Sequence, residues 1–273
     1  MDIAVVGGTG LLGRRVVDRL RSGGHTVRVL SRDAPVHRID LTTGAGLARA
    51  LEGAAVVVDA SNRTGTSAAT RGTLVEGTAR LLEAEAEVAA GVAHHVCVSI
   101  VNCDEVPLGY YRVKADQERL VERGRTPWTI VRATQFHEFV AATFLAPLKR
   151  LGVHAVPGML LQPVGTSDAA GAVARVAAAA PSRGLVEITG PRVYELGELA
   201  RLWRESNGSR ALPLPVRVPG ALGRALRAGA LTAPGGEGQD TSGVLRGTTT
   251  FEEWLRLRRH APHAGRRVPT ETR

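Results

Sequence analysis

Short runs of apolar residues alternate with longer amphipathic segments over the first half of the chain. Residues 2–6 form an apolar run that ends in glycines, and residues 11–22 carry apolar positions at helical spacing before Gly23 and Gly24. This order predicts a strand, a tight turn and a helix. The alternation continues, and it predicts strands at 26–30, 55–59, 95–100 and 127–132 and helices at 44–52, 68–90 and 109–123. Buried strands that alternate with helices are typical of a parallel sheet with helices on both faces.

The regular alternation of strands and helices ends after residue 133, where prolines and short strands separate the helical segments. We expect helices at 135–150, 167–180, 195–206 and 251–259, an extended stretch at 211–219 and a flexible surface loop at 232–243. The predicted fold class is therefore α/β, a doubly wound Rossmann sheet with a small C-terminal α+β lid. Its expected parts are a sheet core over 1–133, a portion over 134–260 that completes the sheet and caps it, and a disordered basic tail over 261–273.

A glycine-rich turn lies between the first predicted strand and the first predicted helix. Gly8, Gly10 and Gly13 satisfy the G-x-G-x-x-G pattern, and Gly7 adds a further glycine before it. The first glycines permit the tight turn, the middle one lets backbone approach a pyrophosphate, and the last lets the helix pack closely on the strand. The N-terminus of the helix then offers unpaired N–H groups to the phosphates. The predicted dinucleotide contacts in this turn are Gly7, Thr9, Gly10, Leu11, Leu12 and Gly13.

The end of the second predicted strand bears on the choice between the two nicotinamide dinucleotides. An enzyme that uses NAD(H) places a carboxylate there, against the ribose 2′-hydroxyl. Here Ser31 and Arg32 suit a 2′-phosphate, because a guanidinium pairs with phosphate through two hydrogen bonds, and Arg14 is placed to assist from the helix. We therefore expect NADP(H) to be preferred over NAD(H). Asp33 keeps the alternative open, since NAD(H) would be preferred if Asp33 rather than Arg32 faced the ribose.

Composition and charge narrow the expected partners. The 273 residues carry a formal net charge of +9, which suits nucleic acid. The basic residues are scattered, however, without interleaved aromatics or a run of five, so no nucleic-acid partner is expected. No apolar run approaches the roughly 20 residues of a membrane span, and no secretory signal precedes the first strand, so we expect a cytoplasmic protein without a membrane partner. Cys97 and Cys103 lack metal-ligand spacing, and no metal is expected.

Several segments resemble the atypical, NmrA-like and quinone-oxidoreductase-like branch of the short-chain dehydrogenase/reductase superfamily. They run through most of the chain, and they read VVGGTGLLGRR, IDLTTGAGLARALEGAAVVVDAS, HHVCVSI, YYRVKADQERL and PWTIVRATQFHEF. The resemblance implies that Asp40 and Leu41 lie beside the adenine and that Ala60 and Ser61 lie beside the cofactor backbone. It also makes the C-terminal portion the substrate lid, and the residues that it places near the nicotinamide are Ala133, Thr134, Gln135 and Phe136.

Tyr110 and Lys114 are four residues apart on a predicted helix and therefore project from one face. By the resemblance they form the Y-x-x-x-K element of the superfamily. A phenol with a pKa of about 10 is a poor acid at neutral pH, and a nearby ammonium brings it toward the useful range. In the mechanism that the resemblance implies, Tyr110 donates a proton to a carbonyl as hydride arrives, Lys114 holds the ribose and tunes Tyr110, and Ser99 orients the carbonyl. Only two of the 35 basic residues are lysines, Lys114 and Lys149, which favours a required ammonium at position 114.

Three functions are compatible with the sequence, and each takes a small-molecule ligand. The first is an NAD(P)H-dependent oxidoreductase that reduces a carbonyl, quinone or enone by hydride transfer, with His137 in contact with the substrate. The second is a non-catalytic NADP(H)-binding redox sensor, because Tyr111 competes with Tyr110 for the catalytic position and Tyr110 also fits a half-buried structural role. The third is an epimerase or dehydratase that uses its bound cofactor without net redox change.

Overall fold

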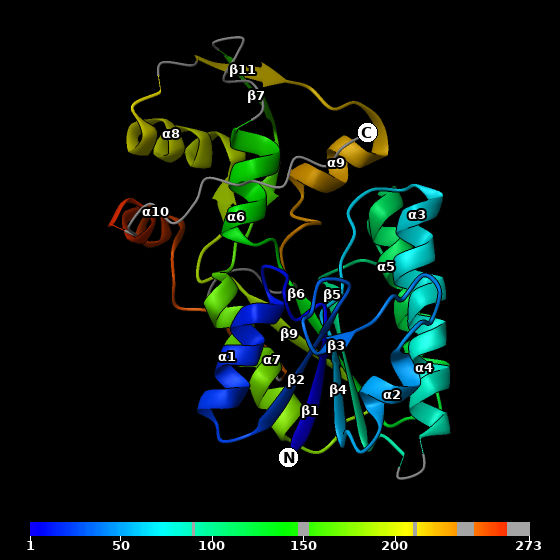
Figure 1. Ribbon diagram of the computed structural model, residues 1–273. Helices are drawn as coiled ribbons and strands as arrows, with labels where there is room; N and C mark the ends of the chain where they lie inside the picture. The colour runs from blue at the N-terminus through cyan, green and yellow to red at the C-terminus, as the bar shows by residue number, and fades with distance from the viewer. Residues whose placement is uncertain (89–90, 147–152, 210–211, 234–242, 261–273) are drawn as a thin grey trace.

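The computed structural model describes residues 1–88, 91–146, 153–209, 212–233 and 243–260 of the chain. In these ranges a parallel sheet of eight strands lies between two layers of helices (Figure 1). Its strands are β1 (Asp2–Val6), β2 (Thr26–Ser31), β3 (His37–Arg38), β4 (Val56–Asp59), β5 (His94–Ile100), β6 (Trp128–Ala133), β9 (Leu185–Thr189) and β12 (Val244–Arg246). They lie in the order β12-β9-β6-β5-β4-β1-β2-β3, so the chain winds outward in both directions from β1 and β4. The predicted Rossmann-type α/β fold is confirmed.

Side chains alternate between the two faces of each strand, and each face packs against its own helices. Ile3 and Val5 of β1 join one core with α1 (Gly13–Ser22) and α7 (Thr166–Ala178). Ala4 and Val6 join a second core with α2 (Leu47–Leu51) and α4 (Gly77–Glu87). On the same side as the second core, α5 (Gly109–Arg123) covers β5 and β6. Burial of both faces explains why the strands read as continuous apolar runs without polar alternation.

Two of the predicted helices are interrupted by a wider, π-helical turn. The segment predicted as one helix at 68–90 consists of α3 (Ala68–Arg71), η1 (Gly72–Glu76) and α4, which ends at Glu87. Gly72 and Gly77, at the two ends of the wide turn, have low helix propensity, and a Cβ on Gly77 would lie 2.9 Å from the Leu41 side chain. The segment predicted at 135–150 consists of α6 (His137–Val140) and η2 (Ala141–Leu145), and residues 147–152 lie outside the described residues.

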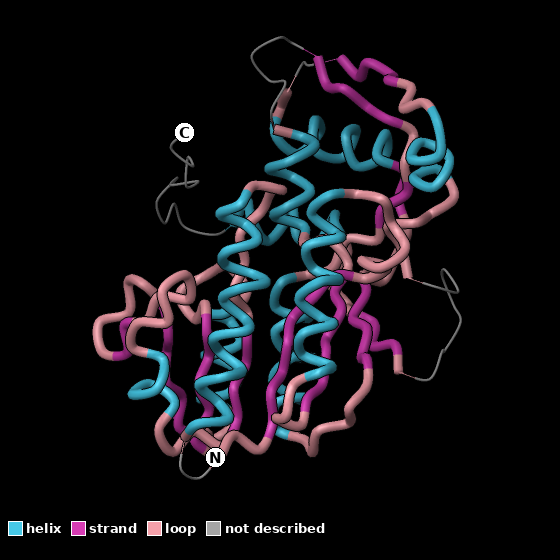
Figure 2. Tube along the Cα trace, turned by 90° about the vertical axis from the view of Figure 1, so that its right-hand side faces the viewer, coloured by secondary structure: helices cyan, strands magenta, loops and turns pink. Residues whose placement is uncertain are grey.

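Residues beyond β6 build a second body at the carboxyl end of the sheet, which we call the cap. Its elements are α6, η2, β7 (Val153–Pro157), β8 (Leu160–Leu161), β10 (Tyr194–Glu195), α8 (Leu196–Asn207), β11 (Leu212–Val216), α9 (Gly220–Arg227) and α10 (Phe251–His260). Figures 1 and 2 show the cap at the end of the molecule away from the N-terminus, with β7 and β11 at its tip. The chain returns to the sheet twice within this region: α7 and β9 follow β8, and β12 follows α9.

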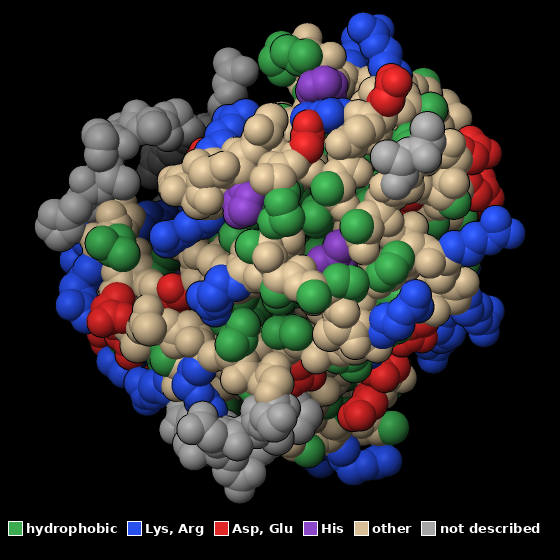
Figure 3. All heavy atoms as spheres, turned by 90° about the horizontal axis from the view of Figure 1, so that it is seen from below, with side chains coloured by type: hydrophobic (Ala, Val, Ile, Leu, Met, Phe, Trp, Pro, Cys, Tyr) green, Lys and Arg blue, Asp and Glu red, His purple; other side chains and the backbone are tan. Residues whose placement is uncertain are grey.

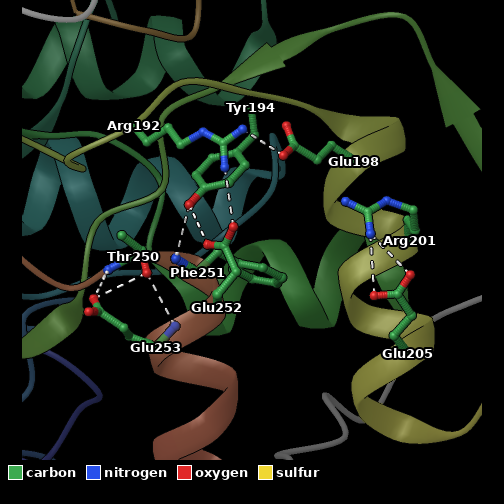
Figure 4. A network of polar contacts seen from close by, with 9 residues as sticks. All are labelled: Arg192, Tyr194, Glu198, Arg201, Glu205, Thr250, Phe251, Glu252 and Glu253. Atoms are coloured by element: carbon green, nitrogen blue, oxygen red, sulfur yellow. Dashed lines mark hydrogen bonds and ion pairs between the residues drawn. The ribbon is translucent and has the colours of Figure 1, made fainter.

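Charged and aromatic side chains tie α10 to the rest of the cap (Figure 4). Arg192 forms ion pairs with Glu198 of α8 at 2.7 Å and with Glu252 of α10 at 3.2 Å. The hydroxyl of Tyr194, a residue that is 1% exposed, donates to Glu252 at 2.6 Å. The carboxylate of Glu253 accepts the backbone N–H of Thr250 at 2.8 Å and so caps the first turn. The helix predicted at 251–259 is thus present as α10, and it is anchored against α8.

The C-terminal half confirms several predicted elements and contains one that was not predicted. The stretch predicted as extended at 211–219 contains β11, and the helices predicted at 167–180 and 195–206 are α7 and α8. Helix α9 was not predicted, because its two glycines, Gly220 and Gly223, obscure the helical pattern. Most of the loop predicted at 232–243 and the whole tail predicted at 261–273 lie outside the described residues. Within the described ranges, no helix is long and apolar enough to cross a membrane.

Candidate functional site

The glycine turn after β1 brings three chain segments closer together than any side chain would allow. The backbone of Gly7 has a φ of +71° and its N–H donates to Leu30 O of β2 at 2.8 Å. A Cβ on Gly7 would lie 2.8 Å from Ala60 O at the end of β4. A Cβ on Gly13 would lie 2.1 Å from Gly7 O, which lies on the other arm of the turn. Glycine is therefore required for the close packing of the turn on α1 and β4.

The outer part of the turn is available to a ligand. Thr9 and Gly10 are exposed and Leu11 is half-buried, whereas Leu12 packs into the core. The carbonyl of Leu11 accepts a hydrogen bond from the Arg15 guanidinium at 2.8 Å, and Arg15 also pairs with Glu138 of α6 at 3.4 Å. The turn and the N-terminus of α1 thus form an open cradle of backbone N–H groups. Such a cradle fits a pyrophosphate.

A hollow of about 360 Å³ opens beyond the end of β2, on the far side of the turn. Its lining residues are Arg32, Arg38, Ile39, Asp40, Thr43, Ala45 and Gly46. Arg38 was not predicted as a site residue. It lies on β3 as the cross-strand partner of Ser31, so it adds a second guanidinium beside the predicted Arg32. Asp33, the residue that favoured NAD(H), is exposed and does not line the hollow.

Asp40 is held in place at the edge of this hollow. Its carboxylate accepts hydrogen bonds from the Thr42 backbone N–H at 2.8 Å and the Thr42 hydroxyl at 2.7 Å. These two bonds, with the nearby charges of Arg32 and Arg38, lower the pKa of Asp40. Leu41, next to it, is buried under α4 in the second core. The predicted adenine-side residues and the two arginines therefore share one end of the site.

The end of β4 lies directly against the glycine turn, as predicted for a cofactor-backbone contact. The Ala60 N–H donates to Val6 O at 3.0 Å, and the fully buried Asp59 accepts the Ser61 N–H at 2.9 Å. The Ser61 hydroxyl oxygen is buried, and it has no hydrogen-bond partner among the described residues. An unsatisfied buried hydroxyl beside the cradle fits a polar ligand passing between the turn and β4.

Tyr110 begins helix α5 with its hydroxyl directed at the segment that follows β4. The hydroxyl donates to Asn62 Oδ1, and Asn62 was not predicted as a site residue. Burial raises the pKa of Tyr110, while the Lys114 ammonium and the Asn62 hydrogen bond act in the opposite direction without cancelling it. Tyr110 is therefore protonated at neutral pH. Tyr111, its neighbour in the chain, is buried in the cap core, and burial raises the pKa of Tyr111 to about 12.

Lys114 lies below Tyr110 on α5, and its ammonium is part of a buried network. It is 3% exposed and donates to Val98 O at 2.7 Å and to Gln117 Oε1 at 2.5 Å. Gln117 in turn donates to Asp59 at 3.1 Å and to Thr78 at 2.9 Å. Gln117 thus connects the lysine to the carboxylate that positions Ser61. Sequence reasoning missed Gln117 and Asp59, although the i, i+3 spacing of Lys114 and Gln117 places them on one helix face.

Ser99 lies at the end of β5 in a different network. It is 3% exposed, and its hydroxyl lies 3.8 Å from Cys103 Sγ. Cys103 donates to Glu118 at 3.2 Å, and Glu118 forms a bidentate pair with Arg132 at 2.6 and 3.0 Å. Burial raises the pKa of Cys103 to about 12, so it is a neutral thiol. No hydrogen bond between Ser99 and Tyr110 is present in the described residues.

The segment predicted to lie near the nicotinamide follows β6 at the same edge of the sheet. Ala133, Thr134 and Gln135 are buried and Phe136 is half-buried. Gln135 donates to Leu231 O at 2.9 Å, and its own carbonyl oxygen is buried without a partner among the described residues. Asn102, which sequence reasoning missed, donates to Ala230 O at 3.1 Å and to Thr232 O at 2.8 Å. The cap segment at 230–232 is therefore held over this edge by two carboxamides.

His137 does not reach the site, which corrects its predicted contact with substrate. Its side chain is fully buried, with the ring 5.6 Å from those of Phe251 and Trp254. Its Nε2 lies 3.0 Å from Thr249 O, and burial lowers the pKa of His137. It is a neutral core residue that joins α6 to α10. As for metals, the described residues contain no group of three or more His, Cys, Asp or Glu side chains that could hold an ion.

Comparison with known proteins identifies the family. Residues 7–143, half of the chain, match the family model described as NAD(P)H-binding. The chain belongs to this NAD(P)H-binding family. The matched segment begins at the first glycine of the turn and ends in η2, so it contains the cradle, the hollow, Tyr110 and Lys114. No protein of curated function matches the sequence.

Solved structures share the fold of this family member over nearly its whole length. An NADPH-dependent quinone oxidoreductase of Escherichia coli, in complex with NADPH, is 20% identical with a TM-score of 0.71, over 93% of this chain and 99% of that one. The triphenylmethane reductase of a Citrobacter species, in complex with NADP(H), is 19% identical with a TM-score of 0.72, over 94% and 99%. A nucleoside-diphosphate-sugar epimerase of Staphylococcus aureus is 18% identical with a TM-score of 0.70, over 93% and 99%. At these identities the likeness concerns the fold alone.

Proposed function

We propose that this protein is an NADP(H)-dependent oxidoreductase that reduces a carbonyl, quinone or enone on a small organic molecule by hydride transfer. The observation that carries the proposal is the hollow at the end of β2, where Arg32 and Arg38 flank a space next to the glycine cradle. Two guanidinium groups at this point favour a 2′-phosphate over a 2′-hydroxyl, because each pairs with phosphate through charge-assisted hydrogen bonds. The preference for NADP(H) over NAD(H) follows from them.

The cofactor fits along the carboxyl edge of the sheet. The backbone of Thr9 to Gly13 would hold the pyrophosphate, with the 2′-phosphate between Arg32 and Arg38 and the adenine beside Asp40 and Leu41. The unpaired Ser61 hydroxyl and the carbonyl of Ala60 would face the backbone of the cofactor. The nicotinamide would lie near residues 133–136, where the free carbonyl oxygen of Gln135 suits an amide donor. When bound, the cofactor supplies the hydride.

Tyr110 would supply the proton. Its phenol carries a proton at neutral pH, which it would donate to the substrate oxygen as the hydride arrives at carbon. The lowering of the Tyr110 pKa expected from Lys114 is outweighed by burial in the structure. The phenolate left behind lies within the field of the Lys114 ammonium, which stabilises the negative charge until a proton returns from water. The Lys114 ammonium donates to Val98 O and Gln117 Oε1, and the contact with the ribose predicted for it stays a hypothesis. Ser99 and the carbonyl-orienting role predicted for it stay a hypothesis.

The same proposal assigns roles to the parts of the chain. Residues 1–133 would be the cofactor-binding core, and residues 134–260 would complete the sheet and close over the substrate as the lid. The cap segment at 230–232, held by Asn102 and Gln135, would then form one wall of the substrate site. Both cysteines are free and buried, which suits the reducing cytoplasm, where we place the protein.

The second candidate is a non-catalytic NADP(H) sensor, and one observation favours it. The Ser99 hydroxyl lies 3.8 Å from Cys103 Sγ, and no hydrogen bond joins it to Tyr110 in the described residues. A protein with this arrangement would bind NADPH through the same cradle and hollow without turning over a carbonyl. The two functions therefore share the cofactor site and differ in whether Tyr110 has a chemical role.

The test is turnover with a matched variant. Purified protein is mixed with NADPH and a panel of quinones, ketones and conjugated enones, and cofactor oxidation is followed at 340 nm. A reductase oxidises NADPH with at least one class of acceptor, and Tyr110→Phe abolishes turnover while the dissociation constant for NADPH changes less than about threefold. Tight NADPH binding without turnover on every acceptor supports the sensor, and unchanged turnover in Tyr110→Phe would contradict the proposed role of this residue.

A further inference from the structure

An apolar face lies exposed at the tip of the cap, far from the cofactor site. Seven large hydrophobic side chains are exposed in the described residues, and three of them lie on β11. Leu212, Leu214 and Val216 are 64%, 53% and 40% exposed. They occupy alternate positions of one strand and therefore project to the same side. Isolated exposed aliphatics are ordinary, whereas these three form an apolar row on one face of one short strand.

We propose that this face docks on an anionic phospholipid bilayer. The surface consists of Leu212, Leu214 and Val216 with the neighbouring Arg217, Arg224 and Arg227, and we call it the β11 face. Docking here is interfacial: the side chains would enter the headgroup region while the rest of the chain stays outside. The proposal is independent of the proposed reaction, and it concerns a surface contact rather than a membrane span.

The edge of β11 argues against another protein strand as the occupant. Among the described residues, β7 is the one strand that pairs with β11, on one edge of it. An added strand would need N–H donors along the other edge, but Pro213 and Pro215 have none. Prolines on an edge strand are a common means of preventing such pairing. The contact must therefore be made through side chains, as it would be on a lipid surface.

From β11 through α9 the described charges are all positive. Helix α8 packs against β7, and its acidic residues Glu198 and Glu205 are paired with Arg192 and Arg201. Arg217, Arg224 and Arg227 are exposed, and none of them has a carboxylate partner in the described part of the chain. The Arg227 side chain lies over Gly158, just past β7, with its Cδ 3.5 Å from the position of a glycine Cβ. Arg224 is one turn away on the same face of α9. Neither of the described stretches that build this tip, 153–167 and 212–233, contains an acidic residue.

This one-sided charge is not a general property of the surface. At the opposite end of the molecule, acidic and basic side chains are interspersed (Figure 3). At the tip, by contrast, the exposed Arg217, Arg224 and Arg227 have no carboxylate partner in the described residues. The β7–β11 ribbon projects beyond the rest of the cap (Figure 2). Aliphatic insertion and attraction to anionic headgroups act together, and each alone binds a bilayer weakly. A projecting ribbon that carries both fits a planar anionic surface.

The experiment is vesicle flotation with the full chain. Vesicles of phosphatidylcholine alone are compared with vesicles that contain about one-third phosphatidylglycerol, at low salt and at high salt. We expect binding to the anionic vesicles only, and weaker binding at high salt because surface charges are screened. Leu212→Ser with Leu214→Ser, and separately Arg217→Glu with Arg224→Glu, should each lower the bound fraction about tenfold. These side chains are exposed, so the variants should keep the thermal stability of the parent.

Two control variants separate the β11 face from general charge and hydrophobicity. Arg125→Glu changes an exposed arginine in the loop before β6, and Leu185→Ser changes an exposed leucine on β9. Both should bind anionic vesicles as the parent does. The proposal is overturned if the parent does not bind, if the β11 variants bind as well as the parent, or if Arg125→Glu loses as much binding as they do. If the parent protein does not bind vesicles but forms dimers, and the leucine variants are monomeric, the β11 face is an interface with a second copy of the chain instead.

Discussion

The contact between the glycine turn and α1 predicts a large effect of a single added methyl group at position 13. In Gly13→Ala the new Cβ would lie 2.1 Å from Gly7 O and 2.8 Å from Gly7 C and Gly8 Cα, all of them backbone atoms. Ordinary contact begins near 3.4 Å, so the turn and the helix must separate by about 1.3 Å. A misplacement of about 1 Å in a site that positions a ligand can cost 100-fold. We therefore expect NADPH to bind at least about 100-fold more weakly, or about 2.8 kcal/mol.

The assay is a titration of intrinsic tryptophan fluorescence with NADPH, together with thermal unfolding of each variant. Gly13→Ala should also lose about 1–3 kcal/mol of stability, because the added methyl overpacks the turn. The matched control is Gly24→Ala, where glycine is favoured by a left-handed φ of +79° rather than by close contacts, since there is open space around the added Cβ. It should lose about 1–2 kcal/mol of stability from left-handed strain and bind NADPH like the parent. If folded Gly13→Ala binds NADPH within threefold of the parent, the cradle does not hold the pyrophosphate.

Further predictions concern Arg38 at the hollow, the buried network of Lys114 and Gln117, and the buried pair of His95 and Glu85. Arg38→Ser should weaken NADPH binding about tenfold or more, since it removes a charge-assisted hydrogen bond. NADH binding should stay unchanged. Equal losses of affinity for both cofactors would refute the role of Arg38 at the 2′-phosphate. Gln117→Leu should lower kcat and shift the pH profile of kcat/KM, because the Lys114 ammonium loses a hydrogen-bond acceptor. The dissociation constant for NADPH should change little. A lower melting temperature with an unchanged pH profile would mean that Gln117 has a structural role alone. His95 Nδ1 and Glu85 Oε1 lie 2.6 Å apart with both side chains fully buried. Burial opposes protonation of His95, but the Glu85 charge outweighs it and raises the pKa of His95 well above its usual value. The His95–Glu85 pair therefore stabilises the fold fully below the unfolded pKa of His95, about 6.5, and this stabilisation is lost as pH rises through the folded pKa. Denaturant unfolding at several pH values should show the decline in the free energy of unfolding. Glu85→Gln should remove this pH dependence and lower the free energy of unfolding by about 3–5 kcal/mol.

The core strands and the cradle could be predicted because their signals are local. β1, the glycines at 7–13 and α1 follow one another within 22 residues, so spacing alone fixes their relation. The juxtaposition of Gly7 with Ala60 followed from the parallel topology, in which the carboxyl ends of neighbouring strands meet. The same topology places Tyr110 near the segment after β4.

The misplaced and missed residues depend on contacts between distant parts of the chain. His137 reads as a polar residue after a strand, and only the packing of Phe251 and Trp254 from α10 shows that it is buried. Arg38 joins the hollow through a two-residue strand, too short to leave a periodic pattern. Asn102 forms hydrogen bonds to a segment about 130 residues further along the chain, and no local sequence motif predicts this contact. In each case tertiary contacts, rather than local propensity, decide the role.

The most direct test of the central claim is a comparison of NADPH and NADH binding by the parent protein under identical conditions. Both titrations follow tryptophan fluorescence at fixed ionic strength, because phosphate contacts weaken with salt. With Arg32 and Arg38 at the 2′-phosphate, NADPH should bind at least about tenfold more tightly than NADH. Equal affinities, tighter binding of NADH or no binding of either cofactor would contradict the account.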